Sequence, residues 1–348
     1  MTDAPLPVAS PSDRFSPRPK IDPRWTRLLW PLLALVALLL FDLFYIGPGF
    51  FRVVVRDGRL YGSLIDILDR ASPVLLLSIG MTLVIATGGV DLSVGAVMAI
   101  ACAVAAQIVV SGHGFAPAFA AALGLALVAG AWNGMLVALL GIQPIVATLI
   151  LMVAGRGAAQ LITGGQIIPF DDPAYRYLGN GFFLGVPFSL TLVAVMLVAT
   201  GLLVRKTAAG LFIEAVGGNA TASRYAGVNA TAVTWGVYVF CAFCSGVAGL
   251  VSAADIQAAD PNSIGLYLEL DAILAVVIGG TALTGGRFSL PGAVLGALVI
   301  QTLTTTILQM GVKAEWNLVV KALVVVVVCL LQSEGLREKI AGAVRRRA

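Results

Sequence analysis

Charged side chains are scarce in this chain. Asp, Glu, Lys and Arg make up only 11% of the 348 residues and hydrophobic residues 59%, and the mean hydropathy is +0.97. A soluble domain carries roughly a quarter charged residues. The shortage of charge excludes a water-exposed globular protein. The long continuous apolar runs predict an all-α integral membrane protein, in which helices satisfy the backbone polar groups internally.

Residues typical of catalysis and metal binding are equally rare. His113 is the only histidine, and the sequence contains no HExxH motif, no GxSxG-type nucleophile turn and no GxxxxGK[ST] phosphate-binding loop. Cys241 and Cys244 have CxxC spacing, but they lie in an apolar run without a second pair or a nearby histidine. We interpret them as packing residues. The chain is therefore not expected to be an enzyme or to hold a cofactor or metal itself.

Ten apolar segments are expected to span the membrane, which requires about 20 apolar residues each. They are 28–47, 71–88, 94–111, 116–140, 145–163, 188–204, 233–254, 270–284, 290–310 and 316–332. The chain accordingly divides into a disordered tail at 1–27, a single transmembrane domain at 28–335 and a basic tail at 336–348. An even number of spans places both termini on the same side of the membrane.

The distribution of Lys and Arg indicates which side that is. If the N-terminus is inside, 14 of the 22 basic residues fall in cytoplasmic segments, and Arg52, Arg56, Arg59, Arg176 and Lys313 fall in outer loops. Cytoplasmic loops of membrane proteins concentrate Lys and Arg. Both termini are therefore expected in the cytoplasm.

A glycine-rich turn occurs twice between expected spans. The sequence TGGVDLSVGAV at 87–97 aligns without a gap with TGGRFSLPGAV at 284–294, and both contain TGG, five residues and GAV. Transporters often contain internal repeats whose helices break near the transport path. Chance similarity between turns rich in Gly, Ala and Val explains the match equally well, so the repeat supports a transporter only weakly.

The segment 205–232 is the longest and most polar loop expected on the cytoplasmic side. Asn219 is a suitable helix N-cap and Gly227 a suitable residue to follow a helix end, so 220–226 is predicted to form a helix of about two turns. Such a helix is a compact knob that another protein could grip. A solvated connector that happens to contain cap residues is the alternative.

Three motifs resemble those of a known transporter family. GGVDLSVG at 88–95 resembles the signature turn of permeases in the ribose, xylose and autoinducer-2 group of ABC importers. EAVGGN at 214–219 with AGV at 226–228 resembles their cytoplasmic coupling loop. VIGG at 277–280, GGR at 285–287 and GAVLGA at 292–297 resemble their late turn. The motifs occur in the family's order, and the similarity covers roughly 60–335.

A second resemblance, within that group, is to permeases of galactofuranose importers. It is carried by DGRLYGS at 57–63, IQPIVATLILMVAGRG at 142–157 and LELDAILAVVIGG at 268–280. Pro291 and the N-terminal tail depart from that subgroup. Because permeases of related sugars share much of these motifs, the resemblance indicates the family more firmly than the sugar.

The resemblance implies a permease like those of type II importers in the bacterial inner membrane, which moves a monosaccharide inward. It implies a second permease subunit, identical or different, a periplasmic sugar-binding protein and an ABC ATPase that carries the ATP and Mg; no nucleic-acid partner is expected. The residues that it assigns to ATPase coupling are Glu214, Gly217, Gly218, Asn219, Ala222, Arg224 and Gly227.

Polar residues within the expected spans form a second set of candidates. An ionisable group at membrane depth costs at least a few kcal/mol, so each needs a reason. A sugar path supplies one, since hydroxyls stripped of water need hydrogen-bond partners. The alternative for each residue is capping, pairing or interfacial solvation. The candidates for the path and its glycine-rich turns are Gly88, Gly89, Asp91, Ser93, Gly95, Asn133, Arg156, Asp271 and Gln301.

A stand-alone or ion-coupled secondary sugar transporter is the alternative function. Its composition and number of spans would be the same. Such a transporter does not need the polar loop at 205–232, so that loop favours the ABC permease.

Overall fold

Helices form most of the structure. The computed structural model describes residues 23–312, 316, 318–323 and 326. The helices are α1 (Pro23–Tyr45), η1 (Pro48–Phe51), α2 (Ser63–Ala86), α3 (Val94–Val110), α4 (Phe115–Gly134), η2 (Met135–Leu139), α5 (Pro144–Thr163), α6 (Pro173–Asn180), α7 (Phe188–Lys206), α8 (Ala209–Gly218), α9 (Ala220–Tyr225), α10 (Ala230–Ile256), α11 (Leu268–Ile278) and α12 (Leu290–Gln309). The predicted all-α class is confirmed.

The strands are short and pair in twos. β1 (Val54–Arg56) pairs with β2 (Arg59–Tyr61), β3 (Ile168–Pro169) with β6 (Ala258–Ala259), and β4 (Phe182–Phe183) with β5 (Val186–Pro187), all antiparallel. They join loops at one end of the bundle and form no larger sheet within the described ranges.

Among the described residues, seven helices are long and apolar enough to cross a membrane: α1, α2, α4 with η2, α5, α7, α10 and α12. α3 is apolar but shorter, at 17 residues. These eight helices match eight of the ten expected spans. The expected span at 316–332 lies mostly outside the described residues, so the count of ten stays a prediction.

The expected span at 270–284 is a half-helix. α11 has 11 residues, or about 16 Å, against a hydrocarbon core of about 30 Å. Gly279 and Gly280 follow its last residue, and Gly280 has φ +84°, which glycine adopts without strain. The chain then continues in irregular backbone to Ser289, the N-cap of α12.

Several helices begin earlier than expected. α2 starts at Ser63 instead of 71, because its first two turns carry polar side chains that a hydropathy criterion assigns to a loop. α1 starts at Pro23, inside the segment expected as a tail. The remainder of that tail, 1–22, and the basic tail at 336–348 lie outside the described residues.

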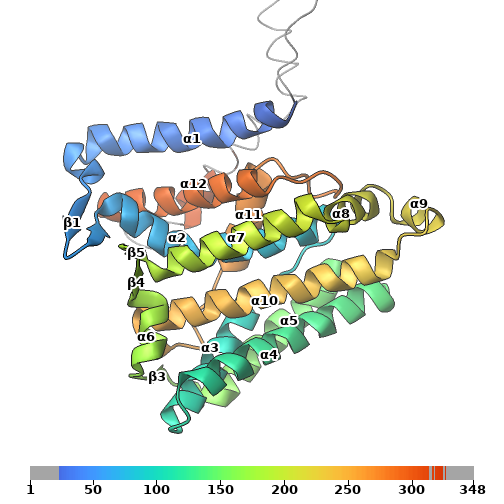
Figure 1. Ribbon diagram of the computed structural model, residues 1–348, viewed down its shortest axis with the longest axis horizontal. Coiled ribbons are helices and arrows are strands. Elements are labelled where there is room, and N and C mark those ends of the chain that lie inside the picture. Colours follow the sequence, from blue (N-terminus) through green and yellow to red (C-terminus); the bar gives the residue numbers. More distant parts are fainter. Residues whose placement is uncertain (1–22, 313–315, 317, 324–325, 327–348) are drawn as a thin grey trace, which may run out of the picture.

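The long helices lie roughly side by side, with α1 at one edge and α4 and α5 at the other (Figure 1). α10 packs against α2, α3 and α4, and α12 packs against α1, α2 and α11. The short strands and α6 gather at one end of the bundle, called here the α6 end, and α8 and α9 lie at the opposite end. α6 and the pair α8 and α9 thus lie at opposite ends of one helical bundle.

Small residues allow these helices to approach closely. A Cβ added at Gly80 in α2 would lie 2.8 Å from Cys241 Cα in α10, and one added at Gly130 in α4 would lie 2.8 Å from Val239 Cα. Such contacts are typical of helix packing in membranes. Cys241 and Cys244 are buried free thiols within this packing, which confirms their interpretation as packing residues.

Candidate functional site

A cavity of about 700 Å³ opens at the α6 end of the bundle. The first half of α2, the last turns of α10 and α12, the start of α7, Gly179 of α6 and the loop before α11 surround it. Its volume lies in the range of small-molecule binding pockets. The polar side chains on its wall are Ser63, Asp66, Asp69, Arg70, Ser189, Ser252, Asp255, Ser263, Gln301, Thr304, Thr305 and Gln309.

Helical spacing brings the polar side chains of each wall to one face. On α12, Gln301 is followed by Thr304 and Thr305, three and four residues later, and residues at this spacing share a helix face. On α2, Asp66 and Asp69 are three residues apart for the same reason. Charged groups on α2 and neutral amide and hydroxyl groups on α12 therefore face the cavity. The rest of its wall is mostly apolar and includes Pro73, Val251, Ile256, Ile264, Leu266, Leu268 and Leu308.

The carboxylate of Asp69 links two walls of this cavity. It accepts a hydrogen bond from Ser189 Oγ at the start of α7, and it lies close enough to Asp66, Asp255 and Arg70 to interact with each of them electrostatically. Carboxylates, a guanidinium, hydroxyls and an amide are the donors and acceptors that a polyhydroxylated ligand needs.

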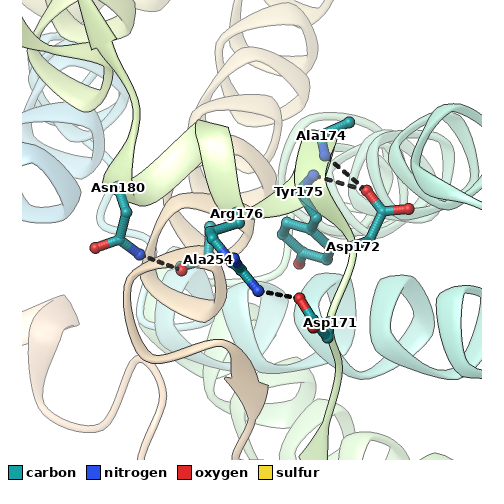
Figure 2. Close-up of polar contacts among 7 residues, drawn as sticks. All are labelled: Asp171, Asp172, Ala174, Tyr175, Arg176, Asn180 and Ala254. Atoms are coloured by element: carbon teal, nitrogen blue, oxygen red, sulfur yellow. Dashed lines mark hydrogen bonds and ion pairs between the residues drawn. The ribbon is translucent and has the colours of Figure 1, made fainter.

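The short helix α6 holds the end of α10 next to the cavity (Figure 2). Asn180 Nδ2 donates to the carbonyl oxygens of Ala254 at 2.9 Å and Asp255 at 3.2 Å. A Cβ on Gly179 would overlap the backbone of the same two residues. Because α6 contacts the backbone on both sides of Asp255, it sets where this cavity carboxylate lies.

Local hydrogen bonds stabilise α6 itself. Asp172 Oδ1 accepts from the backbone N–H groups of Ala174 and Tyr175, both at 2.9 Å, and is the N-cap of the helix. Asp171 forms an ion pair with Arg176, which Figure 2 shows beside this cap. These contacts explain how a segment of eight residues forms a helix at the α6 end of the bundle.

The first glycine-rich turn carries a buried polar cluster. Asp91 Oδ1 accepts from Ser93 N at 2.9 Å and Ser93 Oγ at 2.6 Å, and Asn133 Nδ2 of α4 donates to Ser93 Oγ at 2.8 Å. All three side chains are at most 1% exposed. Thr148 Oγ1 of α5 accepts from Leu92 N at 3.1 Å. These bonds fasten irregular backbone inside the protein, where a membrane chain can tolerate it.

Gly89 allows the same turn to contact α10. A Cβ there would lie 2.5 Å from the hydroxyl oxygen of Tyr238, whose hydroxyl donates to Val90 O at 3.4 Å. A side chain at position 89 would therefore displace the tyrosine. The turn is fastened to α4, α5 and α10 together.

The two glycine-rich turns of the sequence repeat meet in space. A Cβ on Gly285 would lie 2.8 Å from Gly88 N, and Gly285 and Gly88 have φ +86° and +80°. The later glycines of the repeat also occupy close backbone contacts: a Cβ on Gly95 would overlap Gly265 O, and one on Gly292 would overlap Gly279 O. Both copies therefore make close backbone contacts, but the middle glycines differ, since Gly89 adjoins the Tyr238 hydroxyl and Gly286 has no atom that close.

The middle of the loop at 205–232 contacts the place where the two turns meet. A Cβ on Gly217, near the end of α8, would overlap the carbonyl oxygen of Ala86 at the end of α2 and would lie 2.5 Å from Gly286 N. Gly286 N itself donates to Ala86 O at 2.8 Å. The loop therefore contacts the second glycine-rich turn and the end of α2, directly before the first turn, through backbone atoms.

The helix predicted at 220–226 is confirmed as α9. Asn219 Oδ1 accepts from Ala222 N at 2.9 Å, and Gly227 follows the helix with φ +85°. The structure also forms α8 at 209–218, where the sequence predicts a loop, because Ile213 and Val216 are buried on one face of this segment. Glu214, Gly218, Ala222 and Arg224 are exposed, and Tyr225 is 90% exposed. α9 is thus a protruding element (Figure 1).

The candidate path residues fall into separate places. Gln301 lines the cavity, whereas Asp91, Ser93 and Asn133 form the buried cluster described above. Asp271 pairs with Lys321 at 2.8 Å. Arg156 of α5 donates to two carbonyl oxygens of the loop before α11.

Sequence reasoning missed most of the cavity wall. Asp66, Asp69 and Arg70 lay outside the expected span, and Thr304 and Thr305 are uncharged and raised no question. The available signal was spacing: Gln301, Thr304 and Thr305 recur on one helix face. Within the described ranges no group of three His, Cys, Asp or Glu side chains could hold a metal ion.

Comparison with known proteins identifies the family. The family model described as branched-chain amino acid transport system / permease component matches residues 63–329. The chain is 54% identical over 316 residues to the galactofuranose transporter permease protein YtfT of Escherichia coli (strain K12), covering 91% of this chain and 92% of that protein. No solved structure matches the chain.

Two further relatives are sugar import permeases. The fructose import permease protein FruF of Bifidobacterium longum (strain NCC 2705) is 42% identical, with 84% of this chain and 83% of that protein covered. The ribose import permease protein RbsC of Escherichia coli (strain K12) is 35% identical, with 83% and 88% covered. The chain therefore belongs to the permease family of bacterial ABC importers and is a multi-pass protein of the inner membrane.

Proposed function

We propose that this chain is the permease subunit of a binding-protein-dependent sugar importer and that its cargo is a monosaccharide, galactofuranose-like or another pentose or hexose. The cavity at the α6 end carries the proposal. Its volume of about 700 Å³ and its wall of hydroxyl, amide and carboxylate groups suit a small polyol. The relatives named for galactofuranose, fructose and ribose support the same class of cargo.

The wall chemistry explains how a sugar could leave water without a large penalty. Each sugar hydroxyl that loses its water partners needs a donor or acceptor in the protein. Gln301 offers both, Thr304 and Thr305 offer hydroxyls, and Asp69 and Asp255 accept strongly. The sugar would then move from this cavity along the bundle toward the glycine-rich turns.

Energy for that movement would come from a partner. We propose that an ABC ATPase, which carries the ATP and Mg, grips α8 and α9, and that a periplasmic sugar-binding protein docks at the α6 end. A second permease subunit, identical or different, would complete the path. The backbone contact of Gly217 with Ala86 and Gly286 supports this arrangement. A displacement of the loop would move the second glycine-rich turn and the end of α2, which precedes the first turn. A ligand shifts a conformational equilibrium only if it binds the two states with different affinity. Here ATP would act through the different affinities of the ATPase for its two conformations.

Co-purification and uptake test the function together. We expect the tagged chain, extracted in mild detergent, to retain an ABC ATPase and a second permease subunit. Proteoliposomes of that complex should accumulate a radiolabelled pentose or hexose only when the binding protein and ATP are both present. Uptake by the isolated chain without ATP, driven by a sugar or ion gradient, would instead establish the secondary transporter.

The orientation of the chain follows from the same proposal. We infer that both termini and α8–α9 are cytoplasmic and that the cavity faces the periplasm, from the Lys and Arg bias of the loops. Alkaline phosphatase, which is active only in the periplasm, should be silent when fused after residue 348 or within 208–230 and active when fused within 171–180. Activity at the C-terminus would contradict the even number of spans.

A further inference from the structure

The loop at 257–267, between α10 and α11, forms part of the cavity wall without regular helical structure. Ser263, Ile264, Gly265 and Leu266 of this loop all line the cavity. Asp260 Oδ1 organises its turn by accepting from Asn262 N at 2.9 Å and Ser263 N at 3.2 Å. The start of the loop is held by the pairing of β6 with β3, and the segment that lines the cavity also contacts neighbouring helices.

Arg156 of α5 holds this loop on one side. Its Nη1 donates to Ile264 O at 2.6 Å and to Pro261 O at 3.0 Å. One turn later on the same helix face, Gln160 Nε2 donates to Asn262 Oδ1 at 2.8 Å. The guanidinium is well suited to this task because it is always charged and directs several donors in a fixed geometry.

α3 contacts the loop on its other side. Gly265 has φ +75°, and its backbone lies so close to Gly95 that a Cβ on either glycine would overlap the other's carbonyl oxygen. Next to Arg156, a Cβ on Gly155 would lie 3.2 Å from Ala96 Cβ, so α5 and α3 are in contact as well. The loop, α3 and α5 thus form one joint, and α3 begins directly after the first glycine-rich turn.

We infer that Arg156 is a positioning residue for transport. Through the carbonyl groups of Pro261 and Ile264 it holds the loop of the cavity wall against α3, so that this loop moves together with α3 when the first glycine-rich turn moves. Arg156 does not line the cavity. This inference rests on the proposed function for its transport consequence, whereas its structural consequence can be measured independently.

Thiol labelling measures the structural consequence. Ile264 is 6% exposed, and Ile264→Cys should react slowly with a membrane-impermeant maleimide added to spheroplasts, in a chain with Cys329 replaced by Ser. Adding Arg156→Lys should raise the labelling rate about tenfold, the scale expected when one hydrogen bond to a charged group is lost. The exposed Ser263, as Ser263→Cys, should label rapidly in both backgrounds and controls for reagent access.

Transport and ATP hydrolysis measure the functional consequence in the reconstituted importer. Arg156→Lys should lower sugar uptake about tenfold, while ATP hydrolysis stimulated by the loaded binding protein should stay within about twofold, so that fewer sugars move per ATP. Loss of folding would lower both rates and the amount of protein. Arg56→Lys, at an exposed position of β1, should change none of these quantities.

Two outcomes would overturn the inference: unchanged labelling of Ile264→Cys in the Arg156→Lys background, or uptake per ATP equal to that of the parent. If Arg156→Lys does not reach the membrane, Gln160→Ala removes only the second attachment and decides the question in the same assays. If the parent transports none of the tested sugars, the proposed function fails while the labelling result still stands.

Discussion

Replacing Gly217 with alanine is expected to lower sugar uptake by at least about tenfold, within the range typical of a lost coupling between two sites. The added Cβ would overlap Ala86 O and crowd Gly286 N. Both are backbone atoms that cannot rotate away. α8 would have to move away from the end of α2 and from the second glycine-rich turn, so that a displacement of the loop would no longer be transmitted to them. Initial rates of ATP-driven uptake in proteoliposomes, at equal protein amount, measure the effect.

Gly201→Ala is the matched control. Gly201 lies in α7, about one turn before the same loop, and a Cβ there meets nothing within 4 Å. Alanine is also the better helix former, so uptake should be unchanged. If Gly217→Ala transports at the parental rate, the contact between loop and turns is not required for coupling.

Ala222→Asp is expected to weaken ATPase binding about a hundredfold or more, as expected for an unpaired carboxylate buried in an interface. Ala222 is exposed on α9, and under the proposed function it would be covered by the ATPase. Because α9 protrudes from the bundle (Figure 1), membrane insertion and abundance should not change. Co-purification of the ATPase and stimulated ATP hydrolysis should fall together with uptake.

The same substitution at Ala174 tests whether the effect is specific to the proposed docking element. Ala174 is exposed in the first turn of α6, at the opposite end of the bundle, and a helix N-terminus tolerates Asp, so Ala174→Asp should leave ATPase binding intact. Asn219→Ala should give a milder defect than Ala222→Asp, since losing an N-cap costs about 0.5–2 kcal/mol. Normal ATPase retention by Ala222→Asp would exclude α9 as the docking element.

Helices that face lipid were predictable from composition. α5 and α7 are apolar around most of their circumference and remain largely exposed in the bundle, so a hydropathy criterion found them within a few residues. α2 was misjudged by eight residues at its start. Its first turns face a cavity instead of lipid, and that cavity exists only because α6, α7, α10, α12 and the loop before α11 pack around them.

The candidate site divides in the same way. Local chemistry was sufficient for α9, because an N-cap and a following glycine act within a few residues of the backbone. It was insufficient for Asp271, which was proposed for the path and is paired with Lys321, 50 residues away. It was also insufficient for Arg156, whose partners Pro261 and Ile264 are more than 100 residues away.

The sequence by itself determined that this protein lies in a membrane, that it is helical and which family it belongs to, since these follow from composition, periodicity and short motifs. Only the tertiary structure decided which polar groups share a cavity and that the two glycine-rich turns meet each other and Gly217. The physical reason is the distance along the chain between the residues that interact. Capping and hydrophobic burial depend on neighbours along the chain, whereas a cavity or a backbone contact depends on helices that packing brings together.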